Sequence, residues 1–541
     1  MLLQFSQWAP HLTDLGEVAV KHGVMVRIFN LTKADAGVAQ VPARLKAEVA
    51  KPRKPAIVRI AVGMAILLAL LAVAGWWFGR GRWGVATPDE ASIAVLPFAD
   101  ISQEKNQAYF AEGLAEELLE GLGGIPGLRV AARTSSFRFK DGGGDFRTIR
   151  DKLQVSSILQ GSVRKFGNRA RISVQLIETS DGFELWHDSF DREMSDILAV
   201  QQDIANAVVA KLKVTSLVKH TAVTSSRNVN GAAYDAYLQG LYLDRHGSRE
   251  NLQKAEALYE QSLQLDPASA RAWASLGSNR ADQALHNYIP HEEGFSKARQ
   301  ALDRARALDA NLAQPDSTLA FISMYHDWNW EAATFYSQKA LSLDPGSPTA
   351  LNTAATLAMV LGHRDRAIVL YRQAIRIDPL SSAKLLNEGL AYYYSGRYAE
   401  AENALRQSLS LAPERDDVRM TLALVRLAQG KAQEALDEAT REKNEAHRLF
   451  ALSLAHQALG DKTEADALLA KLTSAFASNS PCLVGEIYAY RGDKDRAFEW
   501  FGKAYDAHDS ELTEIKGNPI VRNVERDPRY FALLRKIGLP A

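Results

Sequence analysis

Small and apolar residues recur with a fixed period in the C-terminal half of the chain. An alanine is followed twelve residues later by a proline, and this pair repeats every 34 residues. The marker residues are Ala333 with Pro345, Ala367 with Pro379 and Ala401 with Pro413. Glycines repeat between them at the same spacing, at Gly362, Gly396 and Gly430. Because proline has no N–H group, it ends a helix. The pattern therefore predicts stacked two-helix units, each too small to bury its apolar face alone.

The repeat extends well beyond these three units, and we assign residues 231–541 to one all-α solenoid. Ala255 and Tyr259 continue the pattern upstream, and Ala497 and Phe501 continue it downstream. An unrelated helical bundle with chance periodicity is the alternative, but three markers that share one period favour the array. Such arrays present extended surfaces to partners.

Residues 60–78 carry no charge, and as a helix they would be about as long as the hydrocarbon core of a bilayer is thick. We therefore predict a transmembrane helix over 57–79, with Trp76 and Trp77 at one interface. Lysines and arginines are more frequent before the run than after it, which places a cytoplasmic stub at 1–56. A cleaved signal peptide is the alternative, but the preceding segment is long for one. In a Gram-negative bacterium the later domains would then be periplasmic.

A separate α/β unit is predicted over 91–213, followed by a polar linker at 214–230. The apolar run 92–96 indicates a buried strand. Polar and apolar residues alternate over 171–176, as in a strand with one face in water. Between these strands lies an amphipathic helix, on which Glu116 and Glu117 are expected to face solvent.

Short sequence motifs resemble those of two protein families. Trp273, Leu276 and Gly277 stand where tetratricopeptide repeats have W-x-x-L-G. The stretches SIAVLPFADIS, YFAEGLAEELLEGL and FELWHDSFDRE resemble the TolB-like amino-terminal domain of bacterial membrane proteins. The two resemblances imply a multidomain fold class: a single transmembrane helix, an α/β TolB-like domain, then an all-α tetratricopeptide-repeat solenoid. In that group the cytoplasmic side often carries a class III adenylate cyclase domain or a winged-helix DNA-binding domain.

The stub itself resembles the end of such a cyclase. HLTDLGEVAVK and VMVRIF are similar to the last strands of the cyclase domain. A short tail with incidental alternation is the other interpretation. Only 56 residues precede the predicted span, so no catalytic core fits there. Either the catalytic half was lost, or the reading frame begins too late.

The composition excludes some classes of site and partner, but it does not point to a particular reaction. Lys plus Arg and Asp plus Glu both total 64, so no excess charge favours a nucleic-acid partner. The single cysteine, Cys482, excludes an internal disulfide and a cysteine-based zinc cage, and we expect it in the core of a late helix. No motif points to a catalytic residue, a cofactor or a metal ion, so none is predicted.

If the array binds a peptide, the first helix of each unit should line the groove. By the resemblance to tetratricopeptide repeats, the groove residues are Asn352, Thr356, Met359, Leu386, Leu390, Tyr393, Tyr394, Met420 and Leu424. Aromatic residues and methionines suit a peptide or an amphipathic helix. The alternative is that these side chains pack against neighbouring helices.

Two functions follow from these observations. The first is a membrane-anchored, non-catalytic interaction scaffold or sensory module, with protein or peptide partners and an oligomeric state left open. The second is a truncated class III adenylate cyclase active in cyclic AMP signalling. We prefer the scaffold because no complete catalytic site is present.

Overall fold

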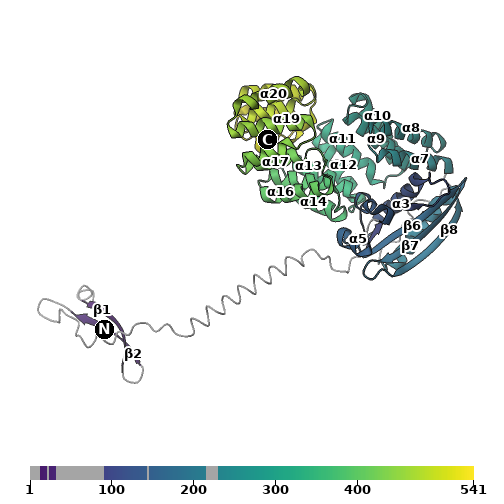
Figure 1. Ribbon diagram of the computed structural model, residues 1–541, viewed down its shortest axis with the longest axis horizontal. Coiled ribbons are helices and arrows are strands. Elements are labelled where there is room, and N and C mark those ends of the chain that lie inside the picture. The colour runs from purple at the N-terminus through teal and green to yellow at the C-terminus, as the bar shows by residue number, and fades with distance from the viewer. Residues whose placement is uncertain (1–11, 21–23, 32–90, 143–144, 215–229, 541) are drawn as a thin grey trace. The chain divides into compact units, whose positions relative to one another are not determined.

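The computed structural model describes residues 12–20, 24–31, 91–142, 145–214 and 230–540, in two units divided near residue 86 (Figure 1). In the first unit, β1 (Leu12–Val20) and β2 (Val24–Leu31) form an antiparallel hairpin. Arg27 Nη2 lies 2.7 Å from Asp14 Oδ2 across the hairpin. The strands occur where the resemblance to the last cyclase strands implied them, but a hairpin of this kind does not by itself identify a cyclase.

The second unit begins with an open, mixed sheet in the order β5-β3-β6-β7-β8, with β4 paired to β6. Its strands are β3 (Ser92–Val95), β4 (Ala99–Asp100), β5 (Arg129–Val130), β6 (Ser157–Phe166), β7 (Arg169–Glu178) and β8 (Glu184–Glu193). The strands from β5 to β6 are parallel, whereas β7 and β8 extend the sheet as antiparallel hairpins. The alternation predicted over 171–176 lies in β7, where Ile172 and Val174 are buried.

Helices cover the two faces of this sheet unequally. The long helices α3 (Ala108–Gly123) and α6 (Ile197–Lys211) pack on one face and form its main core with Ile93, Val95 and Leu176. On the other face, short elements pack on the β3 side of the sheet. These are α4 (Arg133–Ser136), η3 (Phe137–Gly142) and α5 (Phe146–Leu153). Over β7 and β8 this second face is left without a helix among the described residues.

Residues 230–506 form sixteen helices arranged as successive hairpins. They are α7 (Gly231–Asp244), α8 (Arg249–Leu265), α9 (Ala270–Leu285), α10 (His291–Leu308), α11 (Ala313–Tyr325), α12 (Trp330–Leu343), α13 (Pro348–Val360), α14 (Arg364–Ile377), α15 (Ser382–Tyr394), α16 (Tyr398–Leu411), α17 (Val418–Ala428), α18 (Ala432–Thr440), α19 (Glu445–Leu459), α20 (Lys462–Phe476), α21 (Pro481–Tyr490) and α22 (Lys494–Asp506). Gly362, Gly396 and Gly430 adopt φ of 89°, 72° and 76° between paired helices, which confirms the predicted turns.

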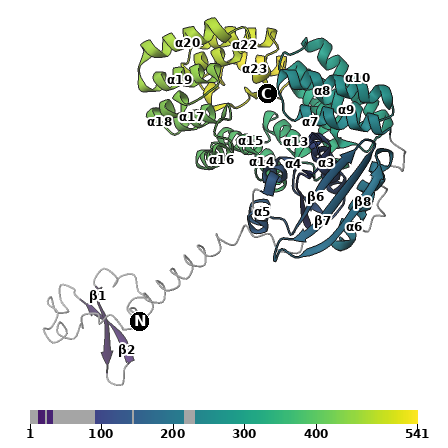
Figure 2. The ribbon, with the colours of Figure 1, turned by 45° about the vertical axis from the view of Figure 1, so that its right-hand side comes forward.

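The end of the array packs against its middle (Figure 2). After α22 come two 3₁₀ turns, η5 (Ser510–Glu514) and η6 (Pro519–Val521), and a last helix, α23 (Pro528–Lys536). Trp330 of α12 donates from Nε1 to the Ile537 carbonyl at 2.8 Å, and Tyr394 of α15 donates to the Glu514 carbonyl at 3.1 Å. We call the packed contact between residues 509–540 and helices α11 to α15 the ring junction.

The α/β domain is docked on the array through α3, which lies between the sheet and α7 (Figure 1). Glu116 and Glu117, expected to face solvent, are instead only 3% exposed. Glu117 pairs with Arg271 of α9 and accepts a hydrogen bond from the Tyr237 hydroxyl at 2.9 Å. An amphipathic pattern distinguishes the polar face of a helix from its apolar face. It does not show whether that polar face contacts water or a charged protein surface. The solvent prediction for these two residues was therefore wrong.

The predicted fold class also needs correction. None of the helices in the described ranges is long and apolar enough to cross a bilayer. The predicted span 57–79 lies outside the described residues, as does most of the 1–56 stub and of the 214–230 linker. No TolB-type β-propeller occurs in the described part either, and the chain is mostly a helical tetratricopeptide-like solenoid beside an open sheet. The resemblance to the TolB-like domain rested on short sequences that form strands and helices. Many α/β folds contain such elements. The domain limits and the periplasmic location stay predictions.

Candidate functional site

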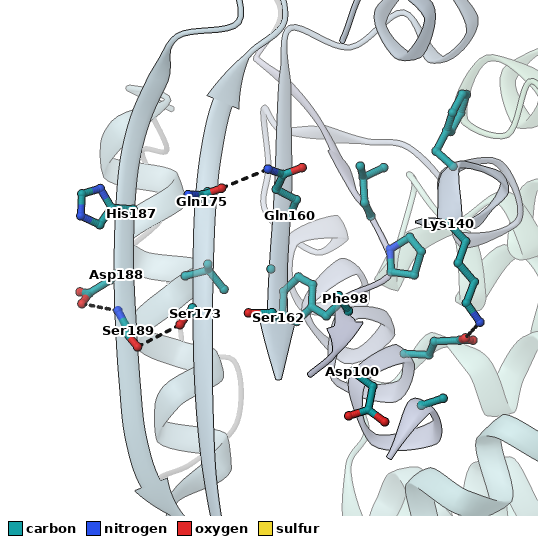
Figure 3. Close-up of a pocket in the computed structure, with 18 of the residues that line it drawn as sticks. Phe98, Asp100, Lys140, Gln160, Ser162, Ser173, Gln175, His187, Asp188 and Ser189 are labelled. Atoms are coloured by element: carbon teal, nitrogen blue, oxygen red, sulfur yellow. Dashed lines mark hydrogen bonds and ion pairs between the residues drawn. The ribbon is translucent and has the colours of Figure 1, made fainter. Parts of the chain in front are cut away.

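A pocket of about 790 Å³ lies on the sheet face that the short helices leave uncovered (Figure 3). Its floor comes from β6, β7 and β8, and its wall from the segment after β3 and from η3 and α5. The polar residues that line the pocket are Asp100, Lys105, Glu112, Lys140, Gln160, Ser162, Ser173, Gln175, His187, Asp188 and Ser189. The site therefore arises because two antiparallel strands extend the sheet beyond its helical cover.

Cross-strand pairs order the polar floor. Gln160 Nε2 donates to Gln175 Oε1 at 3.1 Å, and the hydroxyls of Ser173 and Ser189 lie 3.0 Å apart (Figure 3). Side chains of a strand point alternately to its two faces, so these residues point into the pocket while their neighbours fill the core. The floor thus offers amide and hydroxyl groups at fixed positions, which can both donate and accept hydrogen bonds.

Phe98 packs closely against β6 because Gly161 has no side chain. A Cβ atom at Gly161 would be 2.7 Å from the Ser173 carbonyl oxygen and 3.1 Å from the Phe98 ring. Phe139 and Phe146 add further apolar wall. Aromatic rings beside fixed polar groups are a common combination in small-molecule sites.

Asp100 braces the loop that forms one rim. Its carboxylate accepts hydrogen bonds from the backbone amides of Ser102, at 2.9 Å, and Gln107, at 2.8 Å. Burial acts to raise the pKa of the Asp100 carboxyl, but these hydrogen bonds outweigh it and lower the pKa. Asp100 is therefore held ionised, and its bonds to the backbone fix the rim.

The opposite wall carries an ion pair that reaches the array interface. Lys140 Nζ lies 2.6 Å from Glu112 Oε1, and both residues line the pocket. Arg133 lies 3.9 Å from Glu112 and 2.7 Å from Glu116, one turn further along α3. Glu116 also binds Arg245, the residue that follows α7. A continuous set of charged contacts thus connects the pocket wall to the array.

The pocket was not predicted from the sequence. The alternation of Ser173 and Gln175 with apolar residues revealed a strand with one polar face, but that face was interpreted as solvated. Residues from the segment after β3, from η3 and α5, and from β6, β7 and β8 meet here only through the fold. The one available signal was that β7 and β8 follow the short helical segments that cover the same face of the sheet.

The structure places all nine predicted groove residues on α13, α15 and α17. Six are buried: Thr356, Met359, Leu386, Tyr393, Tyr394 and Leu424. Most of these join one apolar cluster, against which Leu390 and Met420 also pack, while Asn352 accepts a hydrogen bond from Asn387 at 3.1 Å. The side chains therefore pack within the protein, which was the alternative to a groove. Peptide binding at these positions stays a prediction.

Cys482 is fully buried in α21, as expected for a core residue. Burial, followed by the nearby charge of Glu486, raises the pKa of its thiol well above the usual range. The potential ligand atoms of Cys482, Asp509 and Glu511 lie within 4.8 Å of one another. However, the Asp509 carboxylate already accepts hydrogen bonds from the Cys482 and Glu511 backbone amides, both at 3.0 Å. Its role as a cap explains the cluster.

Two family models match parts of the chain. The model "HilA/YgeH-like transcriptional regulator, second domain" matches residues 89–207, which is the α/β domain. A tetratricopeptide-repeat model matches residues 386–446, from within α15 to the start of α19. The second match supports the repeats predicted from their period.

Two of the curated relatives are named as a cyclase and a transcriptional regulator. "Putative adenylate cyclase 3" of Rhizobium meliloti is 34% identical over 232 residues, covering 42% of this chain and 39% of that protein. "Transcriptional regulator HilA" of Salmonella typhimurium is 21% identical over 315 residues, covering 57% of this chain and 55% of that protein. The chain thus spans about two fifths and about half the length of these relatives.

Several solved structures are also similar to parts of this chain. A human IFIT1 dimer with m7Gppp-AAAA has a TM-score of 0.37 and 15% identity, covering 57% of this chain and 77% of that one. PilF of Pseudomonas aeruginosa has a TM-score of 0.32 and 18% identity, covering 39% of this chain and 93% of that one. Both scores are low, and no ligand is carried over to this chain.

Proposed function

We propose that the chain is a sensory and protein-binding module. In this proposal the pocket of the α/β domain binds a small polar molecule, and the tetratricopeptide array holds a protein or peptide partner. The observation that carries the proposal is the charged connection from Lys140 and Glu112 in the pocket wall to Glu116 and Arg245 at the array. A ligand that competes for Lys140 would act directly on this connection.

The chemistry of the pocket indicates the class of ligand. Gln160, Gln175 and the three serines supply neutral donors and acceptors, while the phenylalanines supply apolar contact. This combination favours a neutral or zwitterionic molecule with several hydroxyl or amide groups over a polyanion. The similarity to two proteins named as a cyclase and a transcriptional regulator supports a sensory role, because both names denote regulated outputs.

A thermal-shift screen of sugars, amino acids and nucleosides tests the pocket. We expect at least one compound to raise the unfolding temperature of the wild-type chain and to do so much less for Gln175→Ala. The matched control is Arg171→Ala, on the same strand and the same sheet face but outside the pocket. A hit that stabilises wild type and Gln175→Ala equally, or a screen without hits, contradicts the proposal.

A class III adenylate cyclase is the second candidate. It is favoured by the 34% identity to "Putative adenylate cyclase 3" and by the resemblance of the β1-β2 hairpin sequence to the last cyclase strands. Cyclic AMP accumulation from this chain in a cyclase-deficient host would establish catalysis. The sensory proposal expects none from this chain as printed.

A further inference from the structure

β8 is the edge strand of the sheet, and it is ten residues long. Among the described residues its backbone pairs with β7 alone. Long edge strands leave a row of N–H and C=O groups free, so they can pair with another strand. The question is whether the side chains of β8 select a partner.

The outward backbone groups of β8 are those of Ser189 and of alternate residues on either side. The Ser173 carbonyl oxygen points toward β6, where it would contact a Cβ atom on Gly161. Ser173 is opposite Ser189, so the N–H and C=O of Ser189 must point away from β7. Consistent with this, the Ser189 amide donates to the carboxylate of Asp188, at 2.7 Å, on the outer side of the strand (Figure 3).

Two opposite charges on this edge have no ion-pair partner within the described ranges. The Asp188 carboxylate accepts from the Ser189 amide, and the Arg192 guanidinium donates to the adjacent Asp191 carbonyl at 3.1 Å. Both side chains are exposed, and they lie four residues apart on the same face of β8. An antiparallel copy of β8 can therefore place each opposite the other.

One register of the two strands forms the Asp188–Arg192 pair twice, once on each side of the symmetry axis. With Phe190 on a two-fold axis, Asp188 is opposite Arg192 of the second copy, and His187 is opposite Glu193. The outward backbone groups of Ser189 and Asp191 also meet in this register. Shifting the register by two residues per strand toward the N-terminus puts Asp188 opposite Asp188, and shifting it the other way puts Arg192 opposite Arg192. Like charges directly opposite each other are destabilising.

We propose that the chain forms a two-fold symmetric dimer through β8, with Phe190 at the axis. The two sheets then form one continuous sheet, and the axis is perpendicular to it, so both pockets open on the same face. Residues at the dimer contact, His187 and Ser189, also line the pocket. Charged edges ordinarily discourage pairing, but here one register alone places Asp188 opposite Arg192.

Cysteine pairing in the full chain tests both the dimer and its register. Facing residues at non-hydrogen-bonded positions have Cα atoms about 4.5 Å apart, within the range of about 4.4–6.8 Å for a disulfide. A mixture of Asp188→Cys chains and Arg192→Cys chains should give a covalent dimer on mild oxidation. Each variant alone should not, because its own copies lie about 14 Å apart. The native Cys482 is fully buried and gives little background.

The second test exchanges the charges and measures the dimer affinity of the variants by sedimentation velocity. Asp188→Arg should weaken the dimer about tenfold, because two attractive pairs become repulsive. The double variant Asp188→Arg/Arg192→Asp should restore it. Both sites are exposed, so the fold should persist. A monomeric wild-type chain, a disulfide in either cysteine variant alone, or no rescue by the double variant would each overturn the proposal.

Discussion

Glu116 of α3 accepts hydrogen bonds from both Nε and Nη2 of Arg245, at 2.9 and 2.6 Å, across 129 residues of sequence. The Glu116 side chain is 4% exposed, and the Arg245 side chain is 42% exposed. The pair therefore couples a buried carboxylate of the α/β domain to a half-exposed cation of the array. It makes the docking of the two domains sensitive to a single charge.

Removing the cation should destabilise the docked state. We expect Arg245→Ala to cost about 1–3 kcal/mol, because a buried carboxylate loses a partner but keeps Arg133. Urea unfolding followed by circular dichroism measures the loss. Lys254→Ala is the control, since its pair with Glu250 is exposed and should contribute less than about 1 kcal/mol. Equal losses of stability in the two variants would show that the Glu116–Arg245 pair contributes no more than an exposed ion pair.

Stability should fall as the pH rises from about 4.5 to about 7. Burial, then the charge of Glu511, then that of Asp417, raise the pKa of Glu514 at the ring junction to about 7, from the usual 4.5. The unfolded chain releases this proton first, so the contribution is complete below about pH 4.5 and is lost by about pH 7. The loss from this carboxyl is roughly 3 kcal/mol.

Glu514→Gln tests that assignment. The variant should resemble wild type near about pH 4.5 and exceed it in stability near about pH 8, so its stability depends less on pH. Denaturation midpoints at several pH values give the comparison, with the exposed Glu499→Gln as control. An unchanged slope in Glu514→Gln would refute the role of this carboxyl.

The hydrogen bond from Trp330 should stabilise the ring junction. Trp330→Phe keeps most of the ring but leaves the Ile537 carbonyl without its donor, at a cost of about 1–3 kcal/mol. Limited proteolysis should then release the C-terminal segment faster. Phe335→Ala, on the same helix but 57% exposed, should change the rate little. If Trp330→Phe resisted proteolysis as well as wild type does, this hydrogen bond would not stabilise the ring junction.

Close helix packing at Gly389 can be tested with a matched glycine. A Cβ atom there would lie 2.8 Å from Cγ of Leu405, so Gly389→Ala should cost about 1–3 kcal/mol. Gly502 lies within α22 with nothing within 4 Å of its virtual Cβ, so Gly502→Ala should stabilise by about 0.5–1 kcal/mol. Thermal unfolding distinguishes the opposite signs, and the same sign for both would contradict the packing.

Local patterns predicted what local chemistry determines. Gly396 ends a helix because its backbone needs a left-handed conformation, and Pro379 follows one because it cannot continue it. Both signals lie within a few residues of the structure they determine. The solenoid was therefore predictable from spacing alone.

Long-range contacts were not predictable in this way. Glu117 carries the same charge whether it faces water or Arg271, so hydropathy could not reveal the interface. Tyr393 occupies a groove position in the repeat pattern but is 1% exposed, in the core of the array. The pocket floor likewise depends on strand register, which brings Gln160 opposite Gln175.

The fully buried thiol beside the ring junction can report on how often that contact opens. Cys482 is the sole cysteine, and it packs in the same cluster as Trp330 and Ile537. A thiol reagent added to native protein can reach it only when that cluster separates. The labelling rate of the unmodified chain therefore reports how often the C-terminal segment separates from the middle of the array, without any engineered probe.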